Sequence, residues 1–121
     1  MDFIDRVTQM NNDSLNYHFA YLVNVMACEL LGINYLGQKR GFLKDTVWPL
    51  LTKSKTASFE KLAIAIFQKF SLKKRFCLQM LRFGVADWLL EVLARLTADT
   101  QQYELQYGLA LLMNLTLHRL G

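Results

Sequence analysis

The sequence has little of what stabilises small secreted domains: 121 residues contain two cysteines, one proline, six glycines and two histidines. Two cysteines are too few for a disulfide-stapled scaffold and favour a reduced, intracellular chain. With 53% hydrophobic residues, the composition also excludes disordered and collagen-like chains. The acidic N-terminus has no apolar signal core, and no apolar run approaches the roughly 20 residues of a bilayer span. We therefore predict neither secretion nor membrane insertion.

Motifs for catalysis and metal binding are also missing. The GxSxG, GxGxxG, P-loop and HExxH patterns do not occur, and the ten acidic residues are spread singly. A zinc site needs about four converging ligands, whereas His18 and His118 lie near opposite ends of the chain. We predict no enzyme activity, no metal, no cofactor and no small-molecule substrate. Cys28 and Cys77 fall within apolar helical patterns and are interpreted as buried thiols.

Apolar residues recur at spacings of three and four almost everywhere, which predicts an all-α chain. Asp13 or Ser14 can cap a helix start, whereas Gly32 and Gly84 can each close a helix in the left-handed conformation. Asp45 or Thr46 is expected to begin a helix that runs through Leu51. The polar stretch 52–58 reads as a loop. The other predicted helices cover 3–10, 15–31, 34–39, 59–72, 73–83, 86–96 and 103–120.

Three of these helices contain an internal repeat. HFAYLVNVMA from His18, AIAIFQKFSL from Ala63 and GLALLMNLTL from Gly108 align without gaps, each 45 residues after the one before. Periods of about 40 to 47 residues are typical of armadillo and HEAT repeats. We predict an all-α, armadillo/HEAT-like right-handed helical solenoid of about two and a half repeats, forming a single domain over residues 1–121. The alternative is an ordinary helical bundle.

The last predicted helix, 103–120, is apolar on most of its sides. Leu109, Leu111, Leu112, Leu115 and Leu117 surround it, whereas repeats of this kind bury their apolar faces only by stacking on neighbours. We therefore expect the chain to be a piece of a longer solenoid. Otherwise a partner or a second copy covers this helix, which implies self-association through it.

Three features of the C-terminal half are distinctive. They are YELQYGLALLMNL from Tyr103, Leu72 with its basic followers Lys73 to Arg75, and Gly84 before Trp88-Leu89. With these features, residues 58–121 resemble the armadillo-repeat-containing protein nine family, LisH-domain proteins of cilia and basal bodies. Nothing diagnostic is recognised in 1–57, where no LisH segment is found.

This resemblance implies a non-catalytic scaffold that acts through protein contacts in the assembly or stability of the cilium or basal body. It implies ciliary or microtubule-associated proteins as partners. It also implies a cytoplasmic or cytoskeletal location at the basal body or centriole.

The resemblance also suggests candidate peptide-binding residues. In peptide-binding armadillo proteins, an asparagine on the third helix hydrogen-bonds the backbone of an extended peptide, because an amide offers both donors and an acceptor. Asn114 stands at that position by resemblance, Asn24 aligns with it by the internal repeat, and Lys69 takes the middle place. Because Lys69 breaks the series, we slightly favour the alternative that Asn114 satisfies the backbone of a neighbouring repeat.

Basic residues are concentrated in the middle of the chain. Between Lys39 and Arg82 lie eleven basic and two acidic residues, and Lys73, Lys74 and Arg75 form the most compact group. A basic helical module of this kind can bind nucleic acid or an acidic protein tail. The alternative, which their scatter favours, is that these side chains solvate the outer faces of packed helices.

Overall fold

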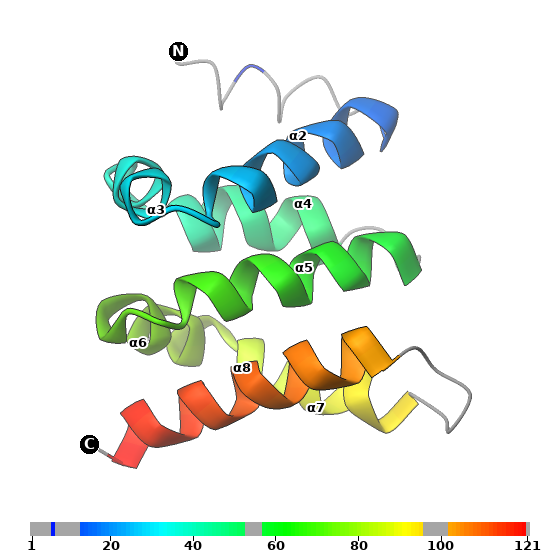
Figure 1. Ribbon diagram of the computed structural model, residues 1–121, viewed down its shortest axis with the longest axis vertical. Helices are drawn as coiled ribbons and strands as arrows, with labels where there is room; N and C mark the ends of the chain where they lie inside the picture. The colour runs from blue at the N-terminus through cyan, green and yellow to red at the C-terminus, as the bar shows by residue number, and fades with distance from the viewer. Residues whose placement is uncertain (1–5, 7–12, 53–56, 96–101, 121) are drawn as a thin grey trace. The chain divides into compact units, whose positions relative to one another are not determined.

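The computed structural model describes Arg6 and residues 13–52, 57–95 and 102–120. Every regular element within these residues is a helix (Figure 1), which confirms the all-α prediction. The expected helix at 3–10 lies outside the described residues apart from Arg6. The elements are α2 (Asp13–Met26), α3 (Leu30–Gly37), the π-helix η1 (Phe42–Val47), α4 (Trp48–Thr52), α5 (Ala57–Phe70), α6 (Lys74–Phe83), α7 (Val85–Arg95) and α8 (Gln102–Leu120).

The chain forms two compact units, Met1–Ala63 and Ile64–Gly121. In the first unit, α2 buries one face whose residues are spaced three and four apart, and this helix packs on α4. Tyr17 on α2 meets Phe59 edge-on, with 5.7 Å between the ring centroids. The unit's most deeply buried apolar side chains include Val23, Phe42, Leu43, Val47 and Leu51.

The junction between α2 and α3 departs from the sequence prediction. Instead of one helix over 15–31, α2 ends at Met26 and a turn precedes α3. Gly32 lies inside α3, so the predicted helix-closing role of Gly32 is wrong. Its function is steric, because a Cβ at position 32 would overlap the carbonyl oxygen of Met26. Glycine thus allows the end of α2 and the first turn of α3 to approach closely.

The next helix also begins earlier than predicted. Gly41 adopts the left-handed conformation with φ 71°, and the π-helix η1 starts directly after it. The backbone N–H of Asp45 donates to the carbonyl oxygen of Gly41 at 2.7 Å. Asp45 and Thr46 therefore lie inside a helix rather than at its start.

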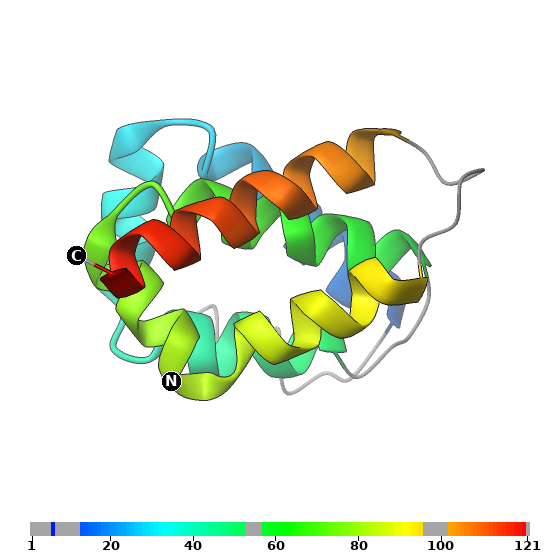
Figure 2. The same ribbon diagram turned by 90° about the horizontal axis from the view of Figure 1, so that it is seen from below.

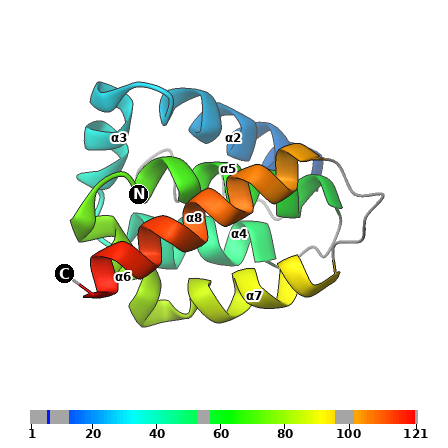
Figure 3. The same ribbon diagram turned by 60° about the horizontal axis from the view of Figure 1, so that its bottom comes forward.

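The second unit follows the sequence prediction closely. The boundaries of α6, α7 and α8 lie within one residue of those predicted, and α5, shared between the units, lies within two. Gly84 closes α6 as expected, with φ 96° and its N–H donating to the carbonyl oxygen of Met80. α8 packs on both α6 and α7, and α7 and α8 run antiparallel (Figures 2 and 3).

Aromatic side chains fill the space between α5 and the helices that follow it. Phe67 meets Trp88 of α7 edge-on, with ring centroids 5.9 Å apart, and Phe70 meets Phe76 of α6 at 5.0 Å. From the other side, α8 inserts Leu111 and Leu115, which are 0% and 1% exposed. The apolar core of this unit therefore lies between α5, α6, α7 and α8.

Candidate functional site

A fully buried serine forms the polar centre of the second unit. Ser71 follows the last turn of α5, and its hydroxyl donates to the carbonyl oxygen of Gln68 at 2.5 Å. Its backbone N–H donates to the carbonyl oxygen of Phe67 at 2.8 Å. The side-chain amide of Asn114 donates to the Ser71 hydroxyl oxygen at 2.9 Å. This last bond joins α8 to the turn between α5 and α6.

The thiol of Cys77 belongs to the same polar centre. Its Sγ donates to the carbonyl oxygen of Ser71 at 2.9 Å. Burial raises the pKa of this thiol from 9.0 to about 11, because desolvation disfavours the thiolate. The prediction of a buried Cys77 is thereby confirmed.

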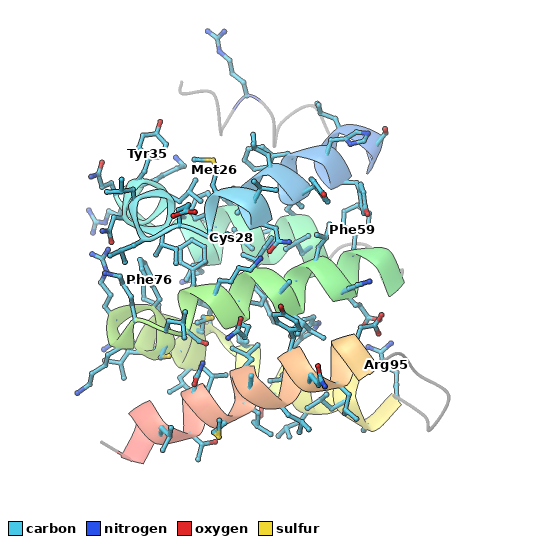
Figure 4. All side chains as sticks on the ribbon, viewed as in Figure 1. Met26, Cys28, Tyr35, Phe59, Phe76 and Arg95 are labelled. Atoms are coloured by element: carbon cyan, nitrogen blue, oxygen red, sulfur yellow. The ribbon has the colours of Figure 1, made fainter. Side chains whose placement is uncertain are left out.

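The same prediction is wrong for Cys28, which is exposed. Cys28 lies in the turn between α2 and α3, where the predicted continuous helix is broken (Figure 4). Its Sγ donates to the backbone carbonyl oxygen of Asn24 at 3.5 Å. The buried apolar face therefore ends at Ala27, directly before this residue.

Asn114 has a structural partner, but this partner differs from the one expected. It binds a serine side chain at the α5–α6 turn rather than a backbone group. Asn114 is half-buried, as are Asn24 on α2 and Lys69 in the last turn of α5. Asn24 belongs to the first unit, whereas Lys69 and Asn114 belong to the second.

The predicted basic group marks the beginning of α6. Lys73 occupies the N-cap position without a side-chain cap, and the first turn of α6 contains no acidic residue. Lys74 and Arg75 are exposed, and the Arg75 guanidinium carbon lies 4.5 Å from the centroid of the Phe76 ring. Because a helix N-terminus carries partial positive charge, three basic residues there favour an anionic neighbour.

The outward side of α8 is apolar, and the sequence prediction identified it only in part. Leu111 and Leu115 point inward, whereas Leu109 and Leu117 are exposed, so one flank of α8 is covered and the other is not, as the sequence predicted. The exposed side chains share a spacing of four residues. They are Leu105 at 43%, Leu109 at 52%, Met113 at 60% and Leu117 at 61% exposure. We call these four residues the α8 row.

The α8 row was detectable from the spacing of four alone, yet the sequence prediction missed Leu105 and Met113.

A second exposed apolar area lies on α2 and α3 in the first unit. It comprises Tyr21, Leu22, Val25, Leu30, Leu31 and Tyr35. Figure 4 shows Tyr35 pointing outward from α3.

Neither metal chemistry nor a membrane span is supported by the residues that the structure describes. Among them, no group of three histidine, cysteine, aspartate or glutamate side chains could hold an ion. No helix within these same residues is both long enough and apolar enough to cross a bilayer.

Comparison with known proteins agrees with the family resemblance seen in the sequence. Residues 80–121 match the family described as LisH domain-containing protein ARMC9, ARM repeats. Relatives with that name include those of Rattus norvegicus and Homo sapiens, each 31% identical over 91% of this chain, and Bos taurus, 28% identical over 96%. The chain spans only 15%, 13% and 17% of these three proteins. No solved structure matches the chain.

These matches confirm the resemblance read from the C-terminal half and extend it over most of the chain. They also identify the helices as armadillo-type repeats, as the 45-residue period predicted. The family match begins at residue 80 and therefore covers the end of α6, all of α7 and all of α8.

Proposed function

This chain is related to the LisH domain-containing protein ARMC9 family through its armadillo repeats, and on that basis we propose that it is a non-catalytic scaffold for protein–protein interaction. The observation that carries the proposal is the exposed apolar side of α8. α8 belongs to the matched repeat, anchors itself through Leu111, Leu115 and Asn114, and presents the α8 row to solvent. An exposed row of large apolar side chains is typical of a surface that contacts another protein.

By family resemblance, the proposed setting is the assembly or stability of the cilium and its basal body. Partners are then ciliary or microtubule-associated proteins, and the location is cytoplasmic or cytoskeletal, at the basal body or centriole. The proposal includes no small-molecule substrate and no cofactor. It also includes self-association through α8.

Localisation in ciliated cells tests this setting. The full chain carrying a fluorescent tag is expected to concentrate at the centriole or basal body, where an independent centriole marker defines the position. A chain with Leu109→Glu and Met113→Glu should lose this concentration while retaining its expression level and its melting temperature. Uniform distribution of the unaltered chain through the cytoplasm would contradict the ciliary assignment.

We propose that the second unit has further partner contacts, beside the α8 row, in the basic residues at the α5–α6 turn: Lys69, Lys73, Lys74 and Arg75. Lys74 and Arg75 are exposed and precede a helix whose first turn lacks acidic residues. We propose Asn114 as a further partner contact. It would either keep its hydrogen bond to Ser71 or exchange that bond for one to the partner. Asn24 is its repeat equivalent on α2 and is half-buried.

The positive start of α6 favours a second candidate function, the binding of an acidic protein tail. We propose that an acidic peptide segment contacts Lys74 and Arg75, and that nucleic acid does not bind there. Fluorescence anisotropy with a polyglutamate peptide and with single-stranded DNA of equal charge separates these two ligands. The peptide should bind more tightly than the DNA, and any residual DNA binding should fall most steeply with salt, because phosphate contacts release counterions.

Two charge-reversal variants provide a matched comparison for this experiment. Lys74→Glu with Arg75→Glu should abolish peptide binding. Arg40→Glu with Lys44→Glu changes the net charge equally at two other exposed positions and should weaken binding only slightly. Equal losses for the two variants would show that net charge, not the start of α6, governs binding. Tighter binding of DNA than of the peptide would assign the basic residues to nucleic acid instead.

A further inference from the structure

The outward side of α6 carries a regular row of basic and apolar side chains. Lys74, Leu78 and Arg82 follow one another at a spacing of four residues, so the two cations lie about 12 Å apart along the helix axis with the leucine midway. Lys74 and Arg82 are exposed, and Leu78 is 37% exposed. The opposite side of the helix is buried, at Cys77 and Met80 among others. We call Lys74, Leu78 and Arg82 the α6 row.

The α6 row has no acidic neighbour along the chain. No aspartate or glutamate occurs from residue 61 to residue 86, whereas six basic residues do. Gln79, which is also exposed, lies beside the row and offers an amide that both donates and accepts hydrogen bonds. The positive charge of this face is therefore not offset within its own helix, and an anionic partner would complement it.

The preceding repeat has no such charges on the same face. α3 and α6 begin alike, since the N-cap residues Glu29 and Lys73 both have an extended backbone. Counted from these N-caps, the buried Ile33 of α3 corresponds to the buried Cys77 of α6. The residues at the positions of the α6 row are uncharged there: Leu30, Asn34 and Gln38. The cations of the α6 row are thus particular to α6 and are not required by the repeat.

We propose that the α6 row binds an acidic amphipathic helix of a partner protein, with acidic side chains facing Lys74 and Arg82 and an apolar one facing Leu78. This inference rests on the acidic-segment binding proposed above and adds the conformation and spacing of that segment. A helix fits because α6 offers side chains, whereas an extended peptide needs backbone donors and acceptors from its receptor. Side chains spaced by four also form ridges that pack into the grooves of another helix.

The central leucine separates this contact from simple charge attraction. Protein interfaces have an apolar centre and a polar rim, and the α6 row has the same order, with Leu78 between two cations. The matching helix carries acidic residues at positions i and i+8 and an apolar residue at i+4, a pattern that is the same in both chain directions. A lipid surface is a poorer match, because Leu78 is partly covered and flanked by cations, whereas membrane binding needs apolar side chains that reach the acyl boundary.

Fluorescence anisotropy with two synthetic peptides of equal composition tests the spacing. The patterned peptide places glutamate, leucine and glutamate at four-residue intervals on one face of an alanine-rich helix. The scrambled peptide distributes the same residues around the helix, and circular dichroism verifies that both are equally helical. The unaltered chain should bind the patterned peptide at least about fivefold more tightly, because only that peptide brings its charges and its leucine to the α6 row together.

Arg82→Gln and Leu78→Gln test the part of the row that the acidic-tail proposal does not use. Arg82→Gln should weaken binding of the patterned peptide by about two- to fivefold, the value of one exposed ion pair. Leu78→Gln should weaken it by about three- to tenfold, whereas Leu78→Met should bind like the unaltered chain. Arg40→Gln is the matched control, since it removes one exposed positive charge outside α6. Equal effects of Arg82→Gln and Arg40→Gln would refute the α6 row as the contact.

The remaining outcomes separate the helix from the acidic-tail proposal. Equal binding of both peptides, abolished by Lys74→Glu with Arg75→Glu, would refute the helix and leave the acidic tail in place. Binding that this double variant does not reduce would overturn both proposals. Tighter binding of a proline-containing peptide of the same charge, which cannot form a helix, would show an extended partner and refute the helix. Preference for vesicles of equal parts phosphatidylserine and phosphatidylcholine over the patterned peptide would assign the row to a membrane and also refute it.

Discussion

The hydrogen bond between Asn114 and Ser71 offers a direct test of whether Asn114 is structural. We expect Ser71→Ala to destabilise the second unit by about 2 kcal/mol, because it removes the bonds to Gln68 and to Asn114, each with a net value of about 1 kcal/mol. Ser71 is fully buried, so water cannot replace its hydroxyl. Asn114→Ala removes one of these bonds and should cost about 1 kcal/mol.

A double-mutant cycle isolates the shared bond. If Asn114 and Ser71 interact as the 2.9 Å distance indicates, the double variant should be less destabilised than the sum of the single variants, by about 1 kcal/mol. Thermal and urea unfolding followed by far-UV circular dichroism measure these differences. A change of 1 kcal/mol corresponds to about 4–8 °C in a domain of 60–100 residues.

Thr116→Ala is the control for this cycle. Its hydroxyl bonds within its own helix and the residue is exposed, so stability should change by less than about 0.5 kcal/mol. A coupling energy below about 0.3 kcal/mol between Ser71 and Asn114 would refute the structural role. If Asn114→Ala instead left stability unchanged and weakened partner binding, Asn114 would be a peptide contact.

Four further predictions concern individual residues. Gly32→Ala should destabilise the first unit by about 1–3 kcal/mol in urea unfolding, because the new methyl group would overlap the Met26 carbonyl oxygen; unchanged stability would contradict this close approach. In native protein near neutral pH, a disulfide reagent should modify exposed Cys28 and spare Cys77, and both should react in denaturant. Because the Cys77 pKa rises to about 11 on folding, its stabilising contribution is present below pH 9.0 and is lost as the pH approaches 11; Cys77→Ala should reduce this alkaline loss. Leu111→Glu should unfold the second unit, seen as a lost or greatly lowered thermal transition, because it places a carboxylate at a fully buried position.

Helix positions in the second unit could be predicted from sequence because local signals agree there. Phe67, Phe70 and Leu89 follow apolar spacing that matches a helix, and Gly84 supplies the left-handed residue that closes α6. At the α2–α3 junction the signals conflict. The apolar run continues past Met26, so spacing predicts one helix, and the break depends on a tertiary approach that only Gly32 permits. Apolar periodicity identifies the buried face of a helix, but it does not show where a contact with another segment ends that helix.

The candidate site was less predictable for a related reason. Apolar spacing says which residues can face a core, but Leu109 and Leu111 have the same side chain and nearly the same sequence surroundings. Their exposures, 52% and 0%, differ because α6 and α7 cover only one side of α8. Likewise, Asn114 could be recognised as a hydrogen-bonding residue, but its partner Ser71 lies 43 positions away on another element. The 45-residue repeat partly compensates for this, because Ile64 and Phe19, the equivalents of Leu109, are both buried. Comparing equivalent positions within one chain therefore identifies Leu109 as a position that the other two copies cover, whereas Leu117 corresponds to Leu72, which is 65% exposed.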